Sequence, residues 1–309
     1  MHILTTAKCL NVPTMNASIA EGNNRLYRYA PTPSGFLHIG NLCNFLLTWI
    51  LAKAGNGKIF LRIDDLDRAR FRTVYLEDIF RKLDAMGLDY SIGPEGPDDF
   101  EKNWSQQLRL PLYNKTLQEL EQQPDVYACT CSRKELEEGK RCECRFAKSI
   151  ENLQPWRFRT SAISPISWDD QLCGKTIVDL HKEMPDFIVR KNGGQPSYQV
   201  ASIADDLYFG VTDIVRGADL QASTGAQLFI TDVLQQPDFR NIRFHHHPLM
   251  VRTSGEKLSK TAGDHLPLTT ADKLHDITLK EIVIQVAGWL KTEGNPTTKE
   301  ELLDAFLHR

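Results

Sequence analysis

Two short apolar segments near the start of the chain enclose a longer segment whose apolar residues repeat at helical spacing. The segments "RLYRYA" (25–30) and "KIFLRI" (58–63) are aromatic or aliphatic and are bounded by turn-forming residues, as β-strands are. Between them, five apolar residues recur three or four positions apart: Leu42, Phe45, Leu46, Trp49 and Ile50. This spacing predicts one buried helix face, with the helix ending at Gly55. The order strand, helix, strand predicts a βαβ unit, which requires a parallel sheet.

The pattern changes twice further along the chain. A second helix is predicted from Thr73, which suits an N-cap, to Gly87. Residues 125–185 then interrupt the α/β pattern, with β-like pieces such as "WRFRT" and "TIVDL", and indicate an insertion. Strand and turn character returns at "DFIVR" (186–190), and the sequence beyond residue 270 is helical in character.

These patterns predict an α/β fold with a doubly wound, Rossmann-like parallel sheet. We divide the chain into an unstructured extension (1–24), the first half of a nucleotide-binding domain (25–124), an insertion (125–185), the second half (186–268) and a helical tail (269–309). The segment "RFHHHPL" (243–249) is interpreted as a strand. Its consecutive histidines cannot all reach one metal ion, because alternate side chains of a strand point to opposite faces.

Composition and charge exclude some classes of protein, but they do not indicate a function. The 309 residues carry a formal net charge of -3, so any basic surface for nucleic acid has to be local. No stretch approaches the run of about 18 apolar residues that a membrane span needs, and residues 1–24 make a poor secretion signal. We therefore expect a cytoplasmic protein that does not use a membrane.

Four of the seven cysteines lie in "CTCSRKELEEGKRCEC" (129–144). In a reducing compartment, clustered cysteines hold a metal ion more often than they form disulfides. Two disulfides or unreactive thiols remain the alternatives. The other three cysteines, Cys9, Cys43 and Cys173, are scattered and are interpreted as structural or incidental.

The segment "APTPSGFLHIGN" joins the first strand to the first helix. Gly35 and Gly40 allow a ligand to approach the backbone, and the helix N-terminus that follows offers free N–H groups to an anion. His38 lies where it can donate to a phosphate. Far downstream, "GEKLSK" (255–260) carries Lys257 and Lys260, which can stabilise a departing pyrophosphate if a loop delivers them. Alone, each motif is more often an ordinary turn or a solvated surface.

Together, "HIGN" and "KLSK" resemble the paired signature motifs of class I aminoacyl-tRNA synthetases. The blocks "YRYAPTPSGFLHIGN", "LRIDDLDRAR" and "PSYQVASIADDLYFGVTDIVRGADL" are similar to the glutamyl-tRNA synthetase group, and the resemblance covers about residues 25–268. It implies ATP-dependent activation of L-glutamate, with Mg²⁺ accompanying ATP. The implied glutamate-binding residues are Arg28, Ala30, Thr32, Asp64, Tyr198 and Arg216. The implied catalytic and ATP-binding residues are His38, Gly40, Lys257 and Lys260.

Two positions depart from the family pattern. The family's "RIED" is "RIDD" here, so Asp64 stands where a glutamate contacts the substrate ammonium. Ser202 stands where an asparagine is frequent. Both keep polar chemistry but change the predicted shape of the pocket.

The resemblance also implies which cysteines would bind a metal ion. The family's zinc segment begins with a C-x-C pair, matched by Cys129 and Cys131, and has a later cysteine before an arginine, matched by Cys144. The family's tyrosine ligand is absent, since that position is Lys140, and Cys142 can take its place. Four thiolates suit one tetrahedral Zn²⁺ and leave no open position, so the implied zinc is structural.

The sequence stops soon after "KLSK", where a complete glutamyl-tRNA synthetase continues into an anticodon-binding portion. The chain therefore resembles the truncated branch of the family, whose members attach glutamate to the queuosine base of tRNA(Asp). The expected partners are ATP, L-glutamate and tRNA, with queuosine-containing tRNA(Asp) favoured, and the expected state is a monomer. The alternatives are a truncated glutamate-tRNA ligase or another acceptor, and a non-catalytic tRNA-binding paralogue.

Overall fold

The computed structural model describes residues 25–132, 134–135, 138, 142–144, 154–249 and 276–309. At the centre of this part of the chain lies a four-stranded sheet in the order β2-β1-β8-β9, with every neighbouring pair parallel. Its strands are β1 (Leu26–Tyr29), β2 (Lys58–Leu61), β8 (Asp213–Gly217) and β9 (Arg243–His247). The predicted parallel sheet is confirmed.

Alternate residues of this sheet enter two separate cores, because successive side chains of a strand point to opposite faces. One core contains Tyr27, Tyr29, Ile59, Leu61 and Val215. The other contains Leu26, Phe60, Ile214 and Phe244. A sheet that is buried on both faces is typical of doubly wound α/β folds, and the predicted class is confirmed.

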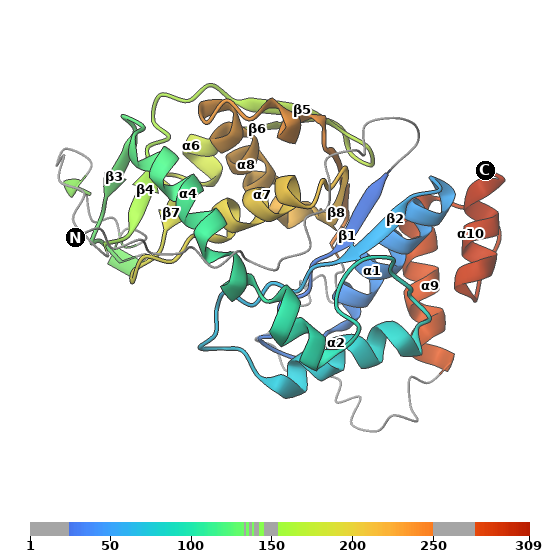
Figure 1. Cartoon of the computed structure of the whole chain (residues 1–309). Coiled ribbons are helices and arrows are strands. Elements are labelled where there is room, and N and C mark those ends of the chain that lie inside the picture. The colour runs from blue at the N-terminus through green and yellow to red at the C-terminus, as the bar shows by residue number, and fades with distance from the viewer. Residues whose placement is uncertain (1–24, 133, 136–137, 139–141, 145–153, 250–275) are drawn as a thin grey trace.

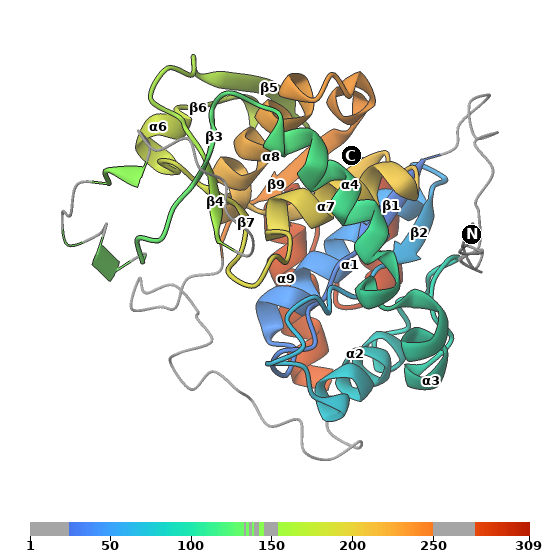
Figure 2. The ribbon, with the colours of Figure 1, turned by 60° about the vertical axis from the view of Figure 1, so that its left-hand side comes forward.

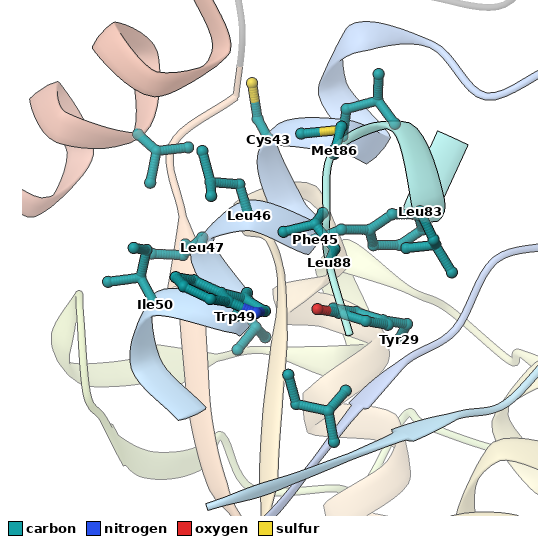
Figure 3. Close-up of a cluster of buried hydrophobic side chains, with 14 of the residues drawn as sticks. Tyr29, Cys43, Phe45, Leu46, Leu47, Trp49, Ile50, Leu83, Met86 and Leu88 are labelled. Carbon is teal, nitrogen blue, oxygen red and sulfur yellow. The ribbon is translucent and has the colours of Figure 1, made fainter. Parts of the chain in front are cut away.

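Helices cover both faces (Figure 1). The first core is closed by α1 (Ile39–Ala54), α2 (Thr73–Ala85), α9 (Asp276–Leu290) and α10 (Lys299–Leu307). The second is closed mainly by α7 (Tyr198–Tyr208) and α8 (Gln221–Val233). Figure 3 shows side chains of α1 packed over Tyr29 of β1, with Leu83, Met86 and Leu88 on one side of the cluster.

The first βαβ unit agrees with the sequence pattern. Helix α1 includes the five apolar residues predicted for its buried face, and Gly55 caps its C-terminus. The start of α2 differs by one residue from the prediction. Arg72 is the N-cap, with an extended backbone at φ -141° and ψ 137°, and Thr73 is already the first helical residue. The predicted Thr73 cap is therefore wrong, because the backbone enters the helix one residue earlier.

Residues between the two halves of the parallel sheet form smaller β structures. An antiparallel sheet has the order β3-β4-β7, from β3 (Val126–Ala128), β4 (Trp156–Phe158) and β7 (Ile188–Arg190). A hairpin is formed by β5 (Ile166–Asp170) and β6 (Gly174–Val178). In Figure 1 and Figure 2 the antiparallel sheet lies on the side of α7 that faces away from α1.

Strand β7 was expected to begin the second half of the catalytic portion, yet it pairs with β4 of the antiparallel sheet. The proposed domain boundaries stay predictions. The remaining helical segments of the described chain are α3 (Pro97–Asp99), α4 (Leu110–Glu121), α6 (Leu180–Glu183) and the short turns at Phe100–Trp104, Gln106–Arg109, Ala218–Leu220 and Pro237–Asn241.

Within the described residues, no helix combines the length and apolarity that crossing a lipid bilayer requires. Residues 1–24, which were expected to be an extension, lie outside the described part of the chain, as do residues 269–275 at the start of the expected tail.

Candidate active site at the switch point of the sheet

The order of the strands identifies where a ligand is expected. The chain passes from β1 to β2 on one side and later adds β8 and β9 on the other, so the strand order reverses between β1 and β8. In open α/β sheets, ligands bind beyond the carboxyl ends of the strands at this point. A cavity of about 330 Å³ lies there. Seven of the residues predicted from the sequence line it: Arg28, Ala30, Thr32, His38, Gly40, Tyr198 and Arg216.

The turn between β1 and α1 forms one wall of the cavity. His38 is the N-cap of α1, with an extended backbone, and its N–H donates to Oδ1 of Asn41 over 3.1 Å. A Cβ on Gly40 would lie 3.1 Å from two atoms of the His38 ring, which is closer than most Cβ contacts, so the ring would have to shift. Glycine at this position therefore lets the imidazole lie against the first helical turn. That turn presents its unpaired N–H groups to an anion.

A buried ion pair on α2 holds the residue before His38. The N–H of Leu37 donates to Oδ2 of Asp78 over 3.0 Å, and Nζ of Lys82 donates to the carbonyl oxygen of Leu37 over 2.6 Å. The two side chains also pair with each other at 2.9 Å. We call this arrangement the Leu37 clamp. The sequence analysis missed it, although an acid and a base four residues apart on a helix are a recognisable signal.

Arg216 reaches the cavity from β8 and is only 4% exposed. One terminal nitrogen donates to Oγ1 of Thr224 over 2.6 Å and to Oε1 of Gln227 over 2.7 Å. The other terminal nitrogen lies 3.5 Å from the hydroxyl of Tyr198. Its Nε–H has no partner within the described residues. Burial lowers the pKa of Arg216 from its usual value.

Among the described residues, the hydrogen-bond partners of Arg216 are all neutral oxygens, and its guanidinium also lies over the ring of Phe244. No carboxylate forms an ion pair with it in the part of the chain that the structure describes. A buried guanidinium that keeps its charge needs an anionic partner, and its planar fork of donors suits a carboxylate. The geometry at Arg216 therefore suits an anionic ligand.

Arg28, by contrast, is already paired. Its Nε donates to Oδ1 of Asp206 over 3.1 Å, and the same oxygen accepts from Arg62 over 2.7 Å. Ser202 joins this group, because it accepts from Arg62 and donates to Asp206, each over 3.2 Å. Asp64 pairs with Arg62 at 2.7 Å and is not among the residues that line the cavity. Its predicted role toward the substrate ammonium stays a prediction.

Lys257 and Lys260 lie outside the described residues. Their predicted role toward the phosphates also stays a prediction.

The four clustered cysteines converge in space. Their sulfur atoms all lie within 4.8 Å of one another. The Sγ atom of Cys142 is 3.6 Å from that of Cys129 and 4.0 Å from that of Cys131, and the Sγ atoms of Cys131 and Cys144 are 3.9 Å apart. Tetrahedral zinc with Zn–S bonds of about 2.3 Å would separate its sulfurs by about 3.8 Å. The cluster can therefore hold a metal ion, and its distances are too long for disulfides.

The three consecutive histidines lie on β9, as predicted, and point alternately. Nε2 of His245 lies 2.9 Å from Oδ1 of Asp213, whereas the ring of His247 stacks on Trp289 of α9 at 4.2 Å between centroids. His246 points to the other face of the sheet, toward Asp170 and Thr224. The sequence analysis did not connect these histidines to the cavity, yet His247 and Trp289 both line it.

Comparison with known proteins agrees with this arrangement. The family of class I tRNA synthetases (E and Q), catalytic domain, matches residues 26–156 and 143–306, and this match shows the class of the protein. A curated relative in Pseudomonas putida (strain W619), named glutamyl-Q tRNA(Asp) synthetase, is 36% identical over 237 residues, which are 76% of this chain and 76% of the relative. A relative of the same name in Cupriavidus metallidurans is 34% identical over 250 residues, covering 76% and 77% of the two chains.

Solved structures extend the likeness to the fold. A glutamate tRNA ligase from Elizabethkingia meningosepticum superimposes with a TM-score of 0.70 at 21% identity, over 90% of this chain and 64% of that one. The glutamate-tRNA synthetase from Elizabethkingia anophelis gives 0.71 at the same identity, over 91% and 65%. This chain thus spans about two thirds of the length of those enzymes. It belongs to the glutamyl-Q tRNA(Asp) synthetase family within the class I synthetases.

Proposed function

We propose that the protein activates L-glutamate with ATP and transfers it to the queuosine base of tRNA(Asp). The observation that carries the first step is Arg216, a buried guanidinium in the switch-point cavity with no carboxylate partner among the described residues. The acceptor is supported by the name that the curated relatives share. ATP, glutamate and tRNA are the partners that this requires, and the cytoplasm supplies all three.

In this proposal the side-chain carboxylate of glutamate binds Arg216, with Tyr198 beside it. Glutamine would place an amide N–H₂ where the guanidinium needs an acceptor, so a buried donor would lose its partner. Arg28, Ala30 and Thr32 line the part of the cavity next to β1 and contact the remainder of the amino acid.

The phosphates of ATP bind at the turn between β1 and α1. His38 and the backbone at Gly40 face them, and the N-terminus of α1 contributes its partial positive charge. Lys257 and Lys260 are assigned to the leaving pyrophosphate. Mg²⁺ bound with ATP would neutralise charge on the phosphate oxygens.

The chemistry needs no protein nucleophile. An oxygen of the glutamate α-carboxylate attacks the α-phosphorus of ATP in line, the bond to the β-phosphate oxygen breaks, and pyrophosphate leaves. A hydroxyl of the acceptor then attacks the carbonyl carbon of glutamyl-adenylate and releases AMP. The protein positions the reactants and stabilises charge, as in other phosphoryl and acyl transfers.

We propose that Cys129, Cys131, Cys142 and Cys144 hold one Zn²⁺. Four thiolates complete a tetrahedral shell, so the ion is structural and fixes the segment that follows β3. All groups assigned to activation lie in one chain, and we propose that a monomer suffices.

Exchange of labelled pyrophosphate into ATP tests the activation step. We expect exchange that depends on L-glutamate, with L-glutamine and L-aspartate at least about a hundredfold less effective, because a missing or misplaced carboxylate leaves Arg216 unpaired. Equal exchange with glutamine, or none with glutamate, would refute the proposed amino acid. A silent tRNA-binding paralogue would give no exchange with any amino acid.

A further inference from the structure

A chain of buried hydrogen bonds runs from the β5–β6 hairpin to Arg216. Oδ2 of Asp170, the last residue of β5, lies 2.5 Å from Nδ1 of His246 on β9. The other ring nitrogen of His246, Nε2, lies 2.8 Å from Oγ1 of Thr224 on α8. That hydroxyl oxygen accepts from Arg216 over 2.6 Å. The activation chemistry described above uses none of Asp170, His246 and Thr224.

The directions of these hydrogen bonds follow from their partners. Asp170 accepts from the backbone N–H groups of Leu172, Cys173 and His246, over 3.0, 2.9 and 3.1 Å. An ionised carboxylate is an acceptor only, so Nδ1 of His246 must be the donor. Burial opposes ionisation of Asp170, but the hydrogen bonds from His246 and the backbone outweigh it and hold its pKa below the usual range.

The second ring nitrogen then acts as an acceptor. Burial lowers the pKa of His246 despite the opposing hydrogen bond to Asp170, and the nearby Arg216 lowers it further, which favours the neutral imidazole. With its proton on Nδ1, Nε2 accepts the hydroxyl proton of Thr224. This directs the lone pairs of Thr224 toward Arg216. The hydroxyl also lies 3.1 Å from the carbonyl oxygen of Leu220, to which it can donate, and without His246 it would donate to that carbonyl alone.

The backbone explains why these residues meet. Arg216 and His246 are paired in register on neighbouring parallel strands, so their side chains leave the same face of the sheet. Thr224 and Gln227 lie three residues apart on α8 and hold the same nitrogen of Arg216. The guanidinium is thus fixed between α8 and a strand, and Asp170 anchors the strand side from the hairpin.

We infer that Asp170 and His246 are positioning residues for amino-acid binding. They fix the Thr224 hydroxyl, which fixes Arg216 for the substrate carboxylate, and they make glutamate binding depend on the β5–β6 hairpin. The inference rests on the proposed function, because it assigns Arg216 to glutamate.

The sharpest test is Asp170→Asn, which nearly keeps the shape of the side chain. The amide oxygen can still accept from the backbone, but the amide N–H₂ cannot accept from Nδ1, so His246 moves its proton to Nε2 and Thr224 loses its acceptor. In pyrophosphate exchange we expect KM for glutamate to rise about tenfold, the scale of one hydrogen bond to a charged group. KM for ATP and kcat should stay within about threefold.

A second pair of variants separates positioning from folding. His246→Leu should raise KM for glutamate, and His246→Gln should restore it in part, because the Gln amide oxygen can accept from Thr224. The matched control is His245→Leu on the same strand. His245 is also buried, but its side chain lies on the opposite face of the sheet, where it bonds to Asp213. It should lower thermal stability without raising KM for glutamate. Circular dichroism identifies any variant that does not fold. If a His246 variant fails to fold, the kinetics of Asp170→Asn decide the question.

The outcomes separate this inference from the proposed function. If the wild-type protein shows no glutamate-dependent exchange, the proposed function fails. If the wild type is active but Asp170→Asn and the His246 variants raise KM for glutamate no more than His245→Leu does, the positioning role is overturned. A selective rise in that KM, with rescue by Gln, supports it.

Discussion

At the scale of single residues, we propose that Arg216, which has no carboxylate partner among the described residues, determines which substrate the cavity accepts. Arg28 and Arg62 share Asp206, whereas Arg216 hydrogen-bonds only to neutral oxygens within the described structure. A substrate carboxylate can therefore bind Arg216 without first breaking an ion pair between described residues. No such cost reduces its binding free energy. We therefore assign the selectivity for glutamate to Arg216 and not to Arg28.

Replacing Arg216 should abolish this selectivity. For Arg216→Ala we expect kcat/KM for glutamate in pyrophosphate exchange to fall by at least about a hundredfold, or roughly 3 kcal/mol, the scale of breaking a buried charged pair. The control is Arg25→Ala. Arg25 is a partly exposed arginine that pairs with Asp213, and it does not line the cavity. Unchanged exchange in the Arg216 variant would show that the carboxylate binds elsewhere.

The buried histidines of β9 should make stability depend on pH. Burial lowers the pKa of His246 and of His247 below the usual histidine value. As the pH falls from 7.5 to 5.5, the unfolded chain takes up more protons at these histidines than the folded chain does. The free energy of unfolding therefore decreases, by up to about 1.4 kcal/mol per pH unit for each histidine.

Urea denaturation at several pH values measures this slope, and His246→Gln isolates one histidine. We expect a shallower slope in that variant than in the wild type. An identical slope in the two proteins would show that His246 does not contribute.

At the scale of elements, the Leu37 clamp joins α2 to the turn that precedes α1. Lys82→Met keeps most of the side-chain volume but removes the donor to the Leu37 carbonyl. Because Leu37 precedes His38, we expect KM for ATP to rise severalfold with a smaller change in KM for glutamate. A fall in stability of about 3 kcal/mol should accompany it, since Asp78 is left buried without its cation.

Arg81→Met is the matched control for the clamp. Arg81 directly precedes Lys82 on α2, is exposed, and lies 3.8 Å from the same Asp78. The Arg81→Met substitution should leave KM for ATP, KM for glutamate and the stability nearly unchanged. Equal effects of the two substitutions would mean that the clamp does not position the turn.

The four-cysteine cluster should bind one zinc per chain. Cys129→Ser should lower the zinc content measured by elemental analysis and destabilise the segment around β3 and β4. The control Cys43→Ala removes a buried thiol from the core around α1, and it should keep its zinc. Stoichiometric zinc in Cys129→Ser, or a folded and active wild type without metal, would contradict this assignment.

The sequence predicted the elements better than the contacts between them. The βαβ unit was predictable because a helical repeat between two short apolar segments has few other arrangements. The pairing of β7 with β4 was not, since three-residue strands carry no signal of their partner. Asp170 and His246 are 76 residues apart, and only the folded hairpin brings them together.

The site was predicted through its motifs. Arg28, His38 and Arg216 lie in segments that resemble a known family, and the cavity brings their side chains together. The carboxylate at Asp64 is paired with Arg62, and a motif match cannot indicate such a partner. Thr224 and Gln227, which hold Arg216 in place together with the predicted Tyr198, were missed because they lie outside the motif positions that were carried over.

At the scale of the whole molecule, we propose that the protein joins glutamate activation to one particular tRNA acceptor. The chain spans about three quarters of its curated relatives and about two thirds of the glutamate-tRNA ligases that share its fold. Activation requires only the switch-point cavity, whereas the choice of acceptor requires a surface that recognises the modified base. The two steps can therefore be measured separately.

The most direct test offers the protein two forms of the same tRNA. The full chain is incubated with ATP, Mg²⁺ and radiolabelled L-glutamate, together with tRNA(Asp) that either contains or lacks queuosine, and with unmodified tRNA(Glu) as a third acceptor. Label in the tRNA is then counted. The account predicts transfer only to queuosine-containing tRNA(Asp). Transfer to the 3′ end of tRNA(Glu), with none to queuosine-containing tRNA(Asp), would contradict it.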